Sequence, residues 1–199
     1  MLKLPHFTYR IKSKLPIAIA FLSLLGAVLQ LWQPDLLYVR KAVNDGAWWK
    51  VFSGQFVHTN WPHYLLNISS LWLFALLFYN TIRVRTFTIS LIILTFFVGL
   101  CLHLFDPRIH WYAGLSGAIY GLFLIGAYSA YQKDDRLVAY GVSVIVIGKV
   151  LGDHWFGLLQ DNADLIGARV VTESHVYGIS VAAILIVMHA IYVRIVRQH

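Results

Sequence analysis

The sequence has few of the residues that stabilise a small soluble or secreted domain. It contains a single cysteine, Cys101, so an internal disulfide and a cysteine-based metal cage are both excluded. Charged residues make up only 13% of the 199 residues, well below the share in soluble domains, which is about 25%. Hydrophobic residues, in contrast, make up 59%. This composition predicts a membrane protein.

Six apolar stretches are long enough to cross a bilayer, which needs about 20 helical residues each. We place them at Leu15–Trp32, Pro62–Asn80, Thr86–Phe105, Leu115–Tyr131, Leu137–Phe156 and Ser174–Val196. The first stretch has no obvious small-residue cleavage site, so we interpret it as a retained span rather than a signal peptide. We expect an all-α polytopic membrane protein with one domain over residues 1–199 and short cytoplasmic tails at 1–14 and 197–199.

The basic residues predict the orientation, because lysine and arginine concentrate in cytoplasmic loops. With the N-terminus inside, the inner segments hold ten of them: Lys3, Arg10, Lys12, Lys14, Arg83, Arg85, Lys133, Arg136, Arg194 and Arg197. The outer segments hold five: Arg40, Lys41, Lys50, Arg108 and Arg169. This asymmetry predicts six spans with both termini cytoplasmic. It also explains the net charge of +7 by topology, so the expected partner is the lipid bilayer and not nucleic acid.

Four polar residues with useful chemistry share one predicted depth. His63 and Asn67 open the second span, Ser116 opens the fourth and His175 opens the sixth. All three spans enter the membrane from the outer side, so these residues lie within about two helical turns of the outer interface. Scattered polar residues are not expected to share a depth.

Glycines flank Ser116 in the stretch G-L-S-G-A-I-Y-G, residues 114–121. A serine that another backbone can approach closely is a candidate nucleophile if a base is near, although small residues also pack membrane helices. His175 is the candidate base, or else a structural histidine bonded to a loop. Gly178, one turn further along, lets another helix approach this part of the chain closely.

His63 and Asn67 are four residues apart, so they face the same way on a helix. Both can donate hydrogen bonds, which a developing oxyanion needs together with the backbone N–H of Ser116. The alternative is that they bond neighbouring helices, although polar groups inside a membrane are often functional. The histidines form no H-E-x-x-H pattern, so a zinc protease is unsupported, and we expect no metal and no cofactor.

Together these motifs resemble those of the rhomboid intramembrane serine proteases. G-L-S-G-A-I-Y at 114–120 is similar to the family's nucleophile motif, and H-V-Y-G at 175–178 to its final H-x-x-G motif. H-T-N-W-P-H-Y-L-L-N at 58–67 is similar to its H-x-x-x-x-H-x-x-x-N motif, and Trp49-Lys50 stands where the family usually has Trp-Arg. The resemblance implies the six-transmembrane-helix rhomboid fold.

The resemblance also implies roles for the matching residues. Ser116 would be the nucleophile and His175 the general base of a dyad, with His63, Asn67 and the Ser116 N–H as the oxyanion hole. The other matches would pack or support the site: Tyr120 on the His175 ring, Gly114, Gly117 and Gly178 between helices, and His58 and Trp49 in the first outer loop, where His58 would form hydrogen bonds.

Four positions depart from the usual family pattern. Lys50 replaces an arginine and so loses bidentate bonding within the loop. Val171 replaces a glycine and Ser174 an alanine, which predicts altered packing between the fourth and sixth spans. Glu173 is also unusual, and we interpret it as a solvated interfacial carboxylate, with tuning of His175 as the alternative.

Residues 48–63 and 170–178 resemble the rhombosortase subfamily. That resemblance implies a Gram-negative inner (cytoplasmic) membrane, with the active site open to the periplasm. It also implies membrane-anchored substrates with a C-terminal sorting tail: a glycine-rich motif, a single transmembrane helix and a basic end. The alternatives are a general rhomboid protease for other single-span substrates and a non-catalytic rhomboid-like helix-binding protein. A small transporter is a further class, but no inverted repeat is evident.

Lys149 lies within the fifth predicted span, where a charge is costly and suggests a function. Asp153 follows at i+4 and is placed to pair with it. An ion pair that extends towards the interface is the simpler interpretation. The alternative is that Lys149 contacts a substrate at the opening between the second and fifth spans.

Overall fold

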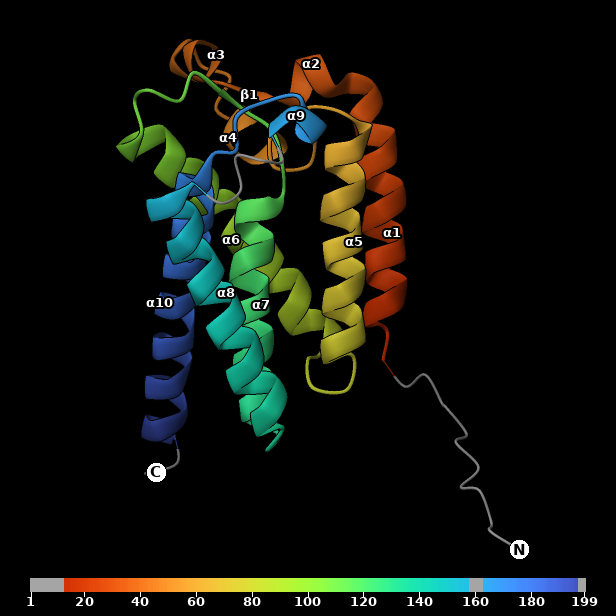
Figure 1. Ribbon diagram of the computed structural model, residues 1–199, viewed down its shortest axis with the longest axis vertical. Helices are drawn as coiled ribbons and strands as arrows, with labels where there is room; N and C mark the ends of the chain where they lie inside the picture. Colours follow the sequence, from red (N-terminus) through yellow and green to blue (C-terminus); the bar gives the residue numbers. More distant parts are fainter. Residues whose placement is uncertain (1–12, 158–162, 197–199) are drawn as a thin grey trace, which may run out of the picture.

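Six long helices form the body of the computed structural model, which describes residues 13–157 and 163–196 (Figure 1). They are α1 (Leu15–Leu29), α5 (Trp61–Phe78), α6 (Val84–Phe105), α7 (Ser116–Tyr131), α8 (Arg136–Phe156) and α10 (Thr172–Val196). With the 3₁₀ turn η1 (Gln30–Trp32) added to α1, each begins and ends within two residues of a predicted span. Most of the predicted N-terminal tail, the last three residues, and Lys3, Arg10, Lys12 and Arg197 lie outside the described residues.

The remaining elements are short and gather at one end of the bundle (Figure 1). They are α2 (Gln33–Leu36), β1 (Tyr38–Val39), α3 (Arg40–Asn44), α4 (Lys50–Ser53), β2 (Trp111–Tyr112) and α9 (Ala163–Ile166). The two strands pair antiparallel, with Tyr38 opposite Tyr112 and Val39 opposite Trp111. This ladder joins the loop between α1 and α5 to the segment directly before Ser116.

Local sequence explains where the helices begin and end. The side chain of Asn60 caps α5 by accepting from the backbone N–H of His63 at 2.8 Å, and Pro62 occupies the first turn. Asp135 caps α8 in the same way through the N–H of Val138. Gly157 then ends α8 in the left-handed conformation that favours glycine.

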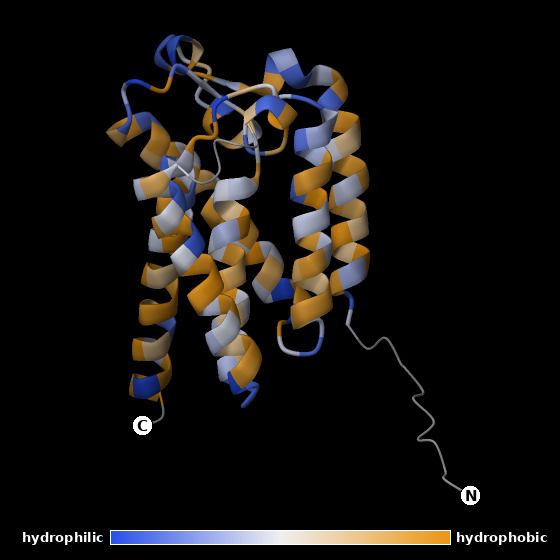
Figure 2. Ribbon diagram, in the orientation of Figure 1, coloured by the Kyte–Doolittle hydropathy of each residue, from blue (hydrophilic) through white to orange (hydrophobic). Residues whose placement is uncertain are grey.

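Apolar residues run along the helices, and polar residues collect in the loops (Figure 2). Within the described part of the chain, four segments are long and apolar enough to cross a membrane: Leu15–Leu36, Trp61–Phe78, Val84–Phe105 and Thr172–Val196. Large side chains such as Ile17, Leu76 and Val144 are exposed on the outside of the bundle, as expected for a lipid-facing surface. These features indicate a multi-pass membrane protein.

The number of spans and their orientation stay predictions. α7 has 16 residues, about 24 Å of helix, and neither it nor α8 belongs to the group of four spanning segments. The beginning of α1 and the end of α10 lie at the same end of the bundle (Figure 1). That arrangement agrees with both termini on one side of a membrane.

α7 lies at the centre of the bundle and contacts α5, α6, α8 and α10. Its sequence has no polar face, which is typical of a helix buried on several sides. Ala118 and Leu122 are fully buried in the core. A Cβ at Gly126 would come within 2.6 Å of the Phe78 ring, so small residues let neighbouring helices approach α7 closely.

Arg40 holds the loop between α1 and α5 against the end of α6. Its guanidinium donates to four carbonyl oxygens, those of Leu102, His103, Asp106 and Ile109, at 2.7–2.8 Å. Because the planar guanidinium carries five N–H donors, one side chain can bind this whole turn. Sequence reasoning placed Arg40 only as an outer-loop charge and missed this role, since the partners are backbone atoms about 65 residues away.

Candidate active site

Ser116 and His175 meet at the end of the bundle that carries the short elements. Ser116 is the first residue of α7, and its Oγ lies 3.0 Å from Nε2 of His175 near the start of α10. His175 is 3% exposed, and among the described residues its Nδ1 has no hydrogen-bond partner. With the ring hydrogen on Nδ1, Nε2 can accept the serine proton.

The ring of Tyr120 supports this histidine from the side. Tyr120 lies one turn after Ser116 on α7, and its ring centroid is 4.4 Å from that of His175, with 32° between the ring planes. A tilted stack of this kind restricts rotation of the imidazole without using either ring nitrogen. Tyr120 is therefore where the family motif predicts it.

Glycines allow α7 and α10 to approach closely enough for this contact. A Cβ on Gly178 would overlap the carbonyl group of Gly117, and a Cβ on Gly117 would lie 2.7 Å from the carbonyl oxygen of Ser174. A Cβ on Gly121 would lie 2.6 Å from the carbonyl oxygen of Gly178. The predicted packing positions Gly117 and Gly178 thus face one another, and Gly121 extends the contact.

Gly114 differs from the expected helix-packing role. It precedes α7 in a loop and has φ +135°, a conformation that residues with a side chain rarely adopt. A Cβ at this position would lie 2.8 Å from Cε1 of His63. Gly114 therefore lets the loop pass over the His63 ring, and it does not separate two helices.

His63 and Asn67 are held by hydrogen bonds within their own part of the chain. Nδ1 of His63 lies 3.1 Å from the hydroxyl of Thr59, which leaves Nε2 towards Gly114. The amide nitrogen of Asn67 donates to the carbonyl oxygen of His63 at 3.2 Å and retains a second N–H. The N–H of Ser116 is at the start of α7 and has no partner within the helix.

Two cavities meet at Ser116. One, of about 240 Å³, lies beneath the outer loops and is lined by His63, Tyr112 and Ser116, among others. The second, of about 330 Å³, lies between α5, α7 and α8 and is lined by Asn67, Ser116 and Lys149, among others. The serine thus borders both spaces, and each predicted oxyanion donor lines one of them.

The Rhomboid domain family model matches residues 45–191, which is most of the chain. The chain belongs to the rhomboid family. Rhomboid proteins are intramembrane serine proteases. No curated protein sequence matches the chain at a significant level. The matched range includes Trp49 and all the residues of the geometry above.

Sequence reasoning missed Tyr112 in this rhomboid. Its side chain is 4% exposed, and its hydroxyl lies near Ser116, Ser174 and the backbone of Gly117 without a hydrogen bond of normal geometry to any described residue. Burial raises the pKa of Tyr112, and these polar neighbours partly oppose the rise. The hydroxyl therefore stays protonated beside the serine. No motif singled out Tyr112, which pairs with Tyr38 in the two-stranded ladder directly before the serine loop.

His58 does not form the side-chain hydrogen bonds that the resemblance implied. Its backbone N–H and C=O bond the side chain of Gln30 at 2.8 and 2.7 Å. Both ring nitrogens are without a hydrogen bond to any described residue. The ring instead packs edge-on against His63, with centroids 5.0 Å apart, and against Tyr64. His58 is thus a packing residue behind His63.

The buried His58 ring predicts sensitivity to acid. Burial, with a smaller effect of nearby His63, lowers the pKa of His58 from 6.5 to about 3. The unfolded chain takes up this proton near its ordinary pKa and the folded chain does not, so the contribution to stability is complete above that pKa and is lost as pH falls towards the folded value. For one proton, the free energy of unfolding changes by about 1.4 kcal/mol per pH unit. Thermal unfolding of the wild type and His58→Gln from about pH 7 to about pH 4 measures it.

We expect the slope of the unfolding free energy against pH to be smaller in His58→Gln than in the wild type, by the contribution of about one proton. The comparison uses slopes against pH, because the substitution also changes stability at every pH. His110→Gln, at an exposed position, is the matched control and should keep the wild-type slope. An unchanged slope in His58→Gln would contradict the prediction.

Trp49 and Lys50 stand at the start of α4 and have different surroundings. The Trp49 side chain is 51% exposed, so it is placed to anchor the loop at an interface rather than to pack inside it. Nζ of Lys50 donates to the carbonyl oxygen of Asp35 and lies 3.4 Å from that of Leu37. A point charge therefore binds this turn in place of the bidentate contact that an arginine provides.

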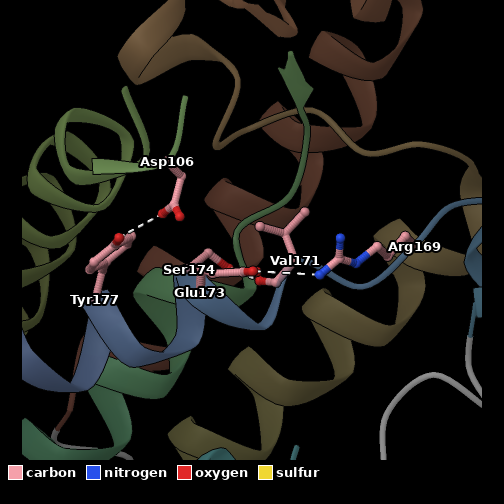
Figure 3. A network of polar contacts seen from close by, with 6 residues as sticks. All are labelled: Asp106, Arg169, Val171, Glu173, Ser174 and Tyr177. Atoms are coloured by element: carbon pink, nitrogen blue, oxygen red, sulfur yellow. Dashed lines mark hydrogen bonds and ion pairs between the residues drawn. The ribbon is translucent and has the colours of Figure 1, made fainter. Parts of the chain in front are cut away.

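Ser174 keeps the packing of α7 and α10 close despite its departure from the family pattern. Its side chain is fully buried, and its hydroxyl donates to the carbonyl oxygen of Val171 at 2.8 Å (Figure 3). This bond satisfies the hydroxyl that an alanine would lack, and it takes no space from α7. Val171 itself lies before α10 begins, so its larger side chain does not enter the helix contact.

Glu173 is less solvated than predicted. Its side chain is 18% exposed and lies 3.5 Å from the guanidinium of Arg169 (Figure 3). On the other side of the same helix start, the hydroxyl of Tyr177 donates to the carboxylate of Asp106 at 2.6 Å. These two contacts fix the beginning of α10, which carries His175, to the α9–α10 segment and to the end of α6.

Metal ligands are not gathered at this site. Within residues 13–157 and 163–196, no group of three or more histidine, cysteine, aspartate or glutamate side chains is placed to hold a metal ion.

Proposed function

We propose that this rhomboid is an active intramembrane serine endopeptidase, with Ser116 as nucleophile and His175 as general base. The observation that supports the proposal most strongly is the 3.0 Å separation between Ser116 Oγ and His175 Nε2. That distance is suited to proton transfer, and the base is shielded from solvent. Rhomboid-like proteins that only bind helices typically lack the serine or the histidine, and this chain has both.

The reaction proceeds by acyl transfer. Ser116 Oγ forms a bond to the carbonyl carbon of the substrate while its proton passes to His175. The peptide C–N bond then breaks, and His175 gives that proton to the leaving amine. Water attacks the resulting ester with the same histidine as base, which releases the carboxylate product and restores the serine.

The negative oxygen that forms during both attacks needs hydrogen-bond donors that are already in place. His63 Nε2, the amide of Asn67 and the N–H of Ser116 are the proposed donors. The contact between the Thr59 hydroxyl and His63 Nδ1, and the hydrogen bond from the Asn67 amide to the His63 carbonyl, fix these side chains before substrate arrives. The two cavities that border Ser116 leave space for a substrate beside these preorganised donors.

The substrates we propose are proteins held in the membrane by a single C-terminal transmembrane helix that follows a glycine-rich motif. A bilayer helix hides its peptide bonds, so it must unwind before attack. Glycines near the cut make unwinding easier. We place cleavage near the outer face of a six-span protein with both termini cytoplasmic, in the inner membrane of a Gram-negative bacterium.

The test uses the purified protein in lipid vesicles and two matched substrates. One carries a glycine-rich motif, a transmembrane helix and a basic end, and in the other alanines replace the glycines. We expect cleavage of the first to be about tenfold faster or more, because each glycine destabilises a helix by about 1 kcal/mol relative to alanine. Mass spectrometry of the products locates the cut.

Equal cleavage of both substrates would contradict the sorting-tail class and favour a general rhomboid protease. No cleavage of either substrate, together with no labelling of Ser116 by a fluorophosphonate probe, would contradict the proposed activity and favour a helix-binding protein. Labelling at Ser116 with cleavage of the glycine-rich substrate supports the whole proposal.

A further inference from the structure

The cavity between α5, α7 and α8 contains one full charge. Most of its wall is apolar, with residues such as Leu73, Phe123 and Val146. Its polar lining comes from Asn67, Ser70, Ser116, Tyr120 and Lys149. The ammonium group of Lys149 is thus the cation among the residues that line this space. A charge in such surroundings is costly unless it has a partner or a function.

The partner of Lys149 within the chain is incomplete. Its Nζ lies 3.9 Å from a carboxylate oxygen of Asp153, too far for a hydrogen bond. The Lys149 side chain is 45% exposed while that of Asp153 is fully buried, and neither carboxylate oxygen accepts a hydrogen bond from a described residue. Asp153 therefore offsets part of the charge of Lys149 without accepting a hydrogen bond from it, so this carboxylate uses none of the three donors of the ammonium group.

Lys149 lies close to the serine of the dyad, because both residues line the same cavity. It precedes the end of α8 at Phe156 by seven residues, or about 10 Å of helical rise. Ser116, in contrast, is the first residue of α7. A group bound by Lys149 is therefore close to the scissile bond, on the side of that bond that is deeper in the membrane.

We propose that Lys149 binds an acidic side chain of the substrate, just beyond the scissile bond in the direction of the transmembrane helix. The inference rests on the proposed proteolytic function. An ammonium group in an apolar cavity attracts a carboxylate far more strongly than a neutral carbonyl, because a low dielectric strengthens charge pairs. The same group repels a basic side chain at that place.

The experiment changes one substrate position at a time, from two to five residues beyond the identified cut, a range of about one helical turn. At each position the substrate carries glutamate, glutamine or lysine. Cleavage is measured in phosphatidylcholine vesicles, so no anionic headgroup competes for Lys149. At one scanned position we expect the wild type to prefer glutamate to glutamine by about tenfold, the effect of one charge-assisted hydrogen bond. The lysine substrate should be cleaved most slowly.

The enzyme variants decide the role of the lysine. Lys149→Met should lose the preference for glutamate, Lys149→Arg should keep it, and Lys149→Glu should favour the lysine substrate. The double variant Lys149→Met with Asp153→Asn removes the unpaired carboxylate and should also cleave glutamate and glutamine substrates equally. Lys133→Met, at an exposed lysine in the turn after α7, is the matched control and should keep wild-type selectivity.

Two results would overturn this inference and leave the protease function intact. One is a wild type that cleaves but shows no preference at any scanned position. The other is a Lys149→Met variant that is slower on all three substrates by the same factor, which would assign the lysine to backbone contacts or folding. Absence of cleavage by the wild type on every substrate would instead overturn the proposed function itself.

Discussion

Ser116→Ala and His175→Ala should each reduce cleavage by about a thousandfold or more. Without Oγ, no group attacks the substrate carbonyl, and without Nε2 the serine keeps its proton at the moment of attack. Because Oγ and Nε2 form one hydrogen-bonded unit, the double variant should be no slower than either single variant. Initial rates on the glycine-rich transmembrane substrate measure the effect.

Each helix offers a matched control for these variants. Ser129 lies on α7 with its hydroxyl bonded to the carbonyl oxygen of Ile125, and His189 lies on α10 beside Tyr128. Ser129→Ala and His189→Ala remove the same groups from the same helices and should keep near-wild-type rates. Thermal unfolding of all four variants tests whether each is folded. Cleavage that persists in purified Ser116→Ala would falsify the assignment of the nucleophile.

Gly178→Ala should have the second largest effect, although it adds a single methyl group. The added Cβ would overlap the carbonyl of Gly117, and a backbone atom cannot move without its helix. Overpacking usually costs about 1–3 kcal/mol, and we expect the upper part of that range or more. We expect a lower unfolding temperature and cleavage reduced by about a hundredfold, the scale of a 1 Å displacement between reacting groups.

Gly141→Ala is the control for the same change in open surroundings. No atom lies within 4 Å of a Cβ at Gly141 on α8. There the methyl group should leave activity unchanged and raise stability slightly, because alanine favours a helix over glycine. If Gly178→Ala behaved like Gly141→Ala, the close contact of α7 with α10 would not determine the geometry of the dyad.

The helices of the body could be predicted from the sequence because their signal is local. A long apolar run needs no partner to be recognised, and caps such as Asn60 with Pro62 mark its beginning. The predicted shared depth of Ser116 and His175 also follows from counting spans. Their helices begin at the same end of the bundle (Figure 1), which is a condition for the 3.0 Å contact.

Contacts that depend on loops were harder to predict. Arg40 binds four carbonyl groups at the end of α6, and Tyr112 reaches the serine through a two-residue strand. Neither has a repeated spacing or a motif that would indicate its partners. Gly114 and His58 were recognised as special positions, but one lies against His63 as a loop glycine and the other packs without a side-chain hydrogen bond.

The sequence by itself determined the membrane class and the family motifs, and it predicted the helix bounds to within two residues, since each depends on composition or on spacing along one chain. The common depth of the polar residues in the membrane stays a prediction. Only the tertiary structure decided how close Ser116 lies to His175, that Glu173 pairs with Arg169, and that Lys149 faces the cavity while Asp153 is buried. Those outcomes depend on which faces of separate helices meet. The two residues of the dyad are 59 positions apart in the chain. Their contact depends on the close packing of the α7 and α10 backbones, which the glycines at that contact permit.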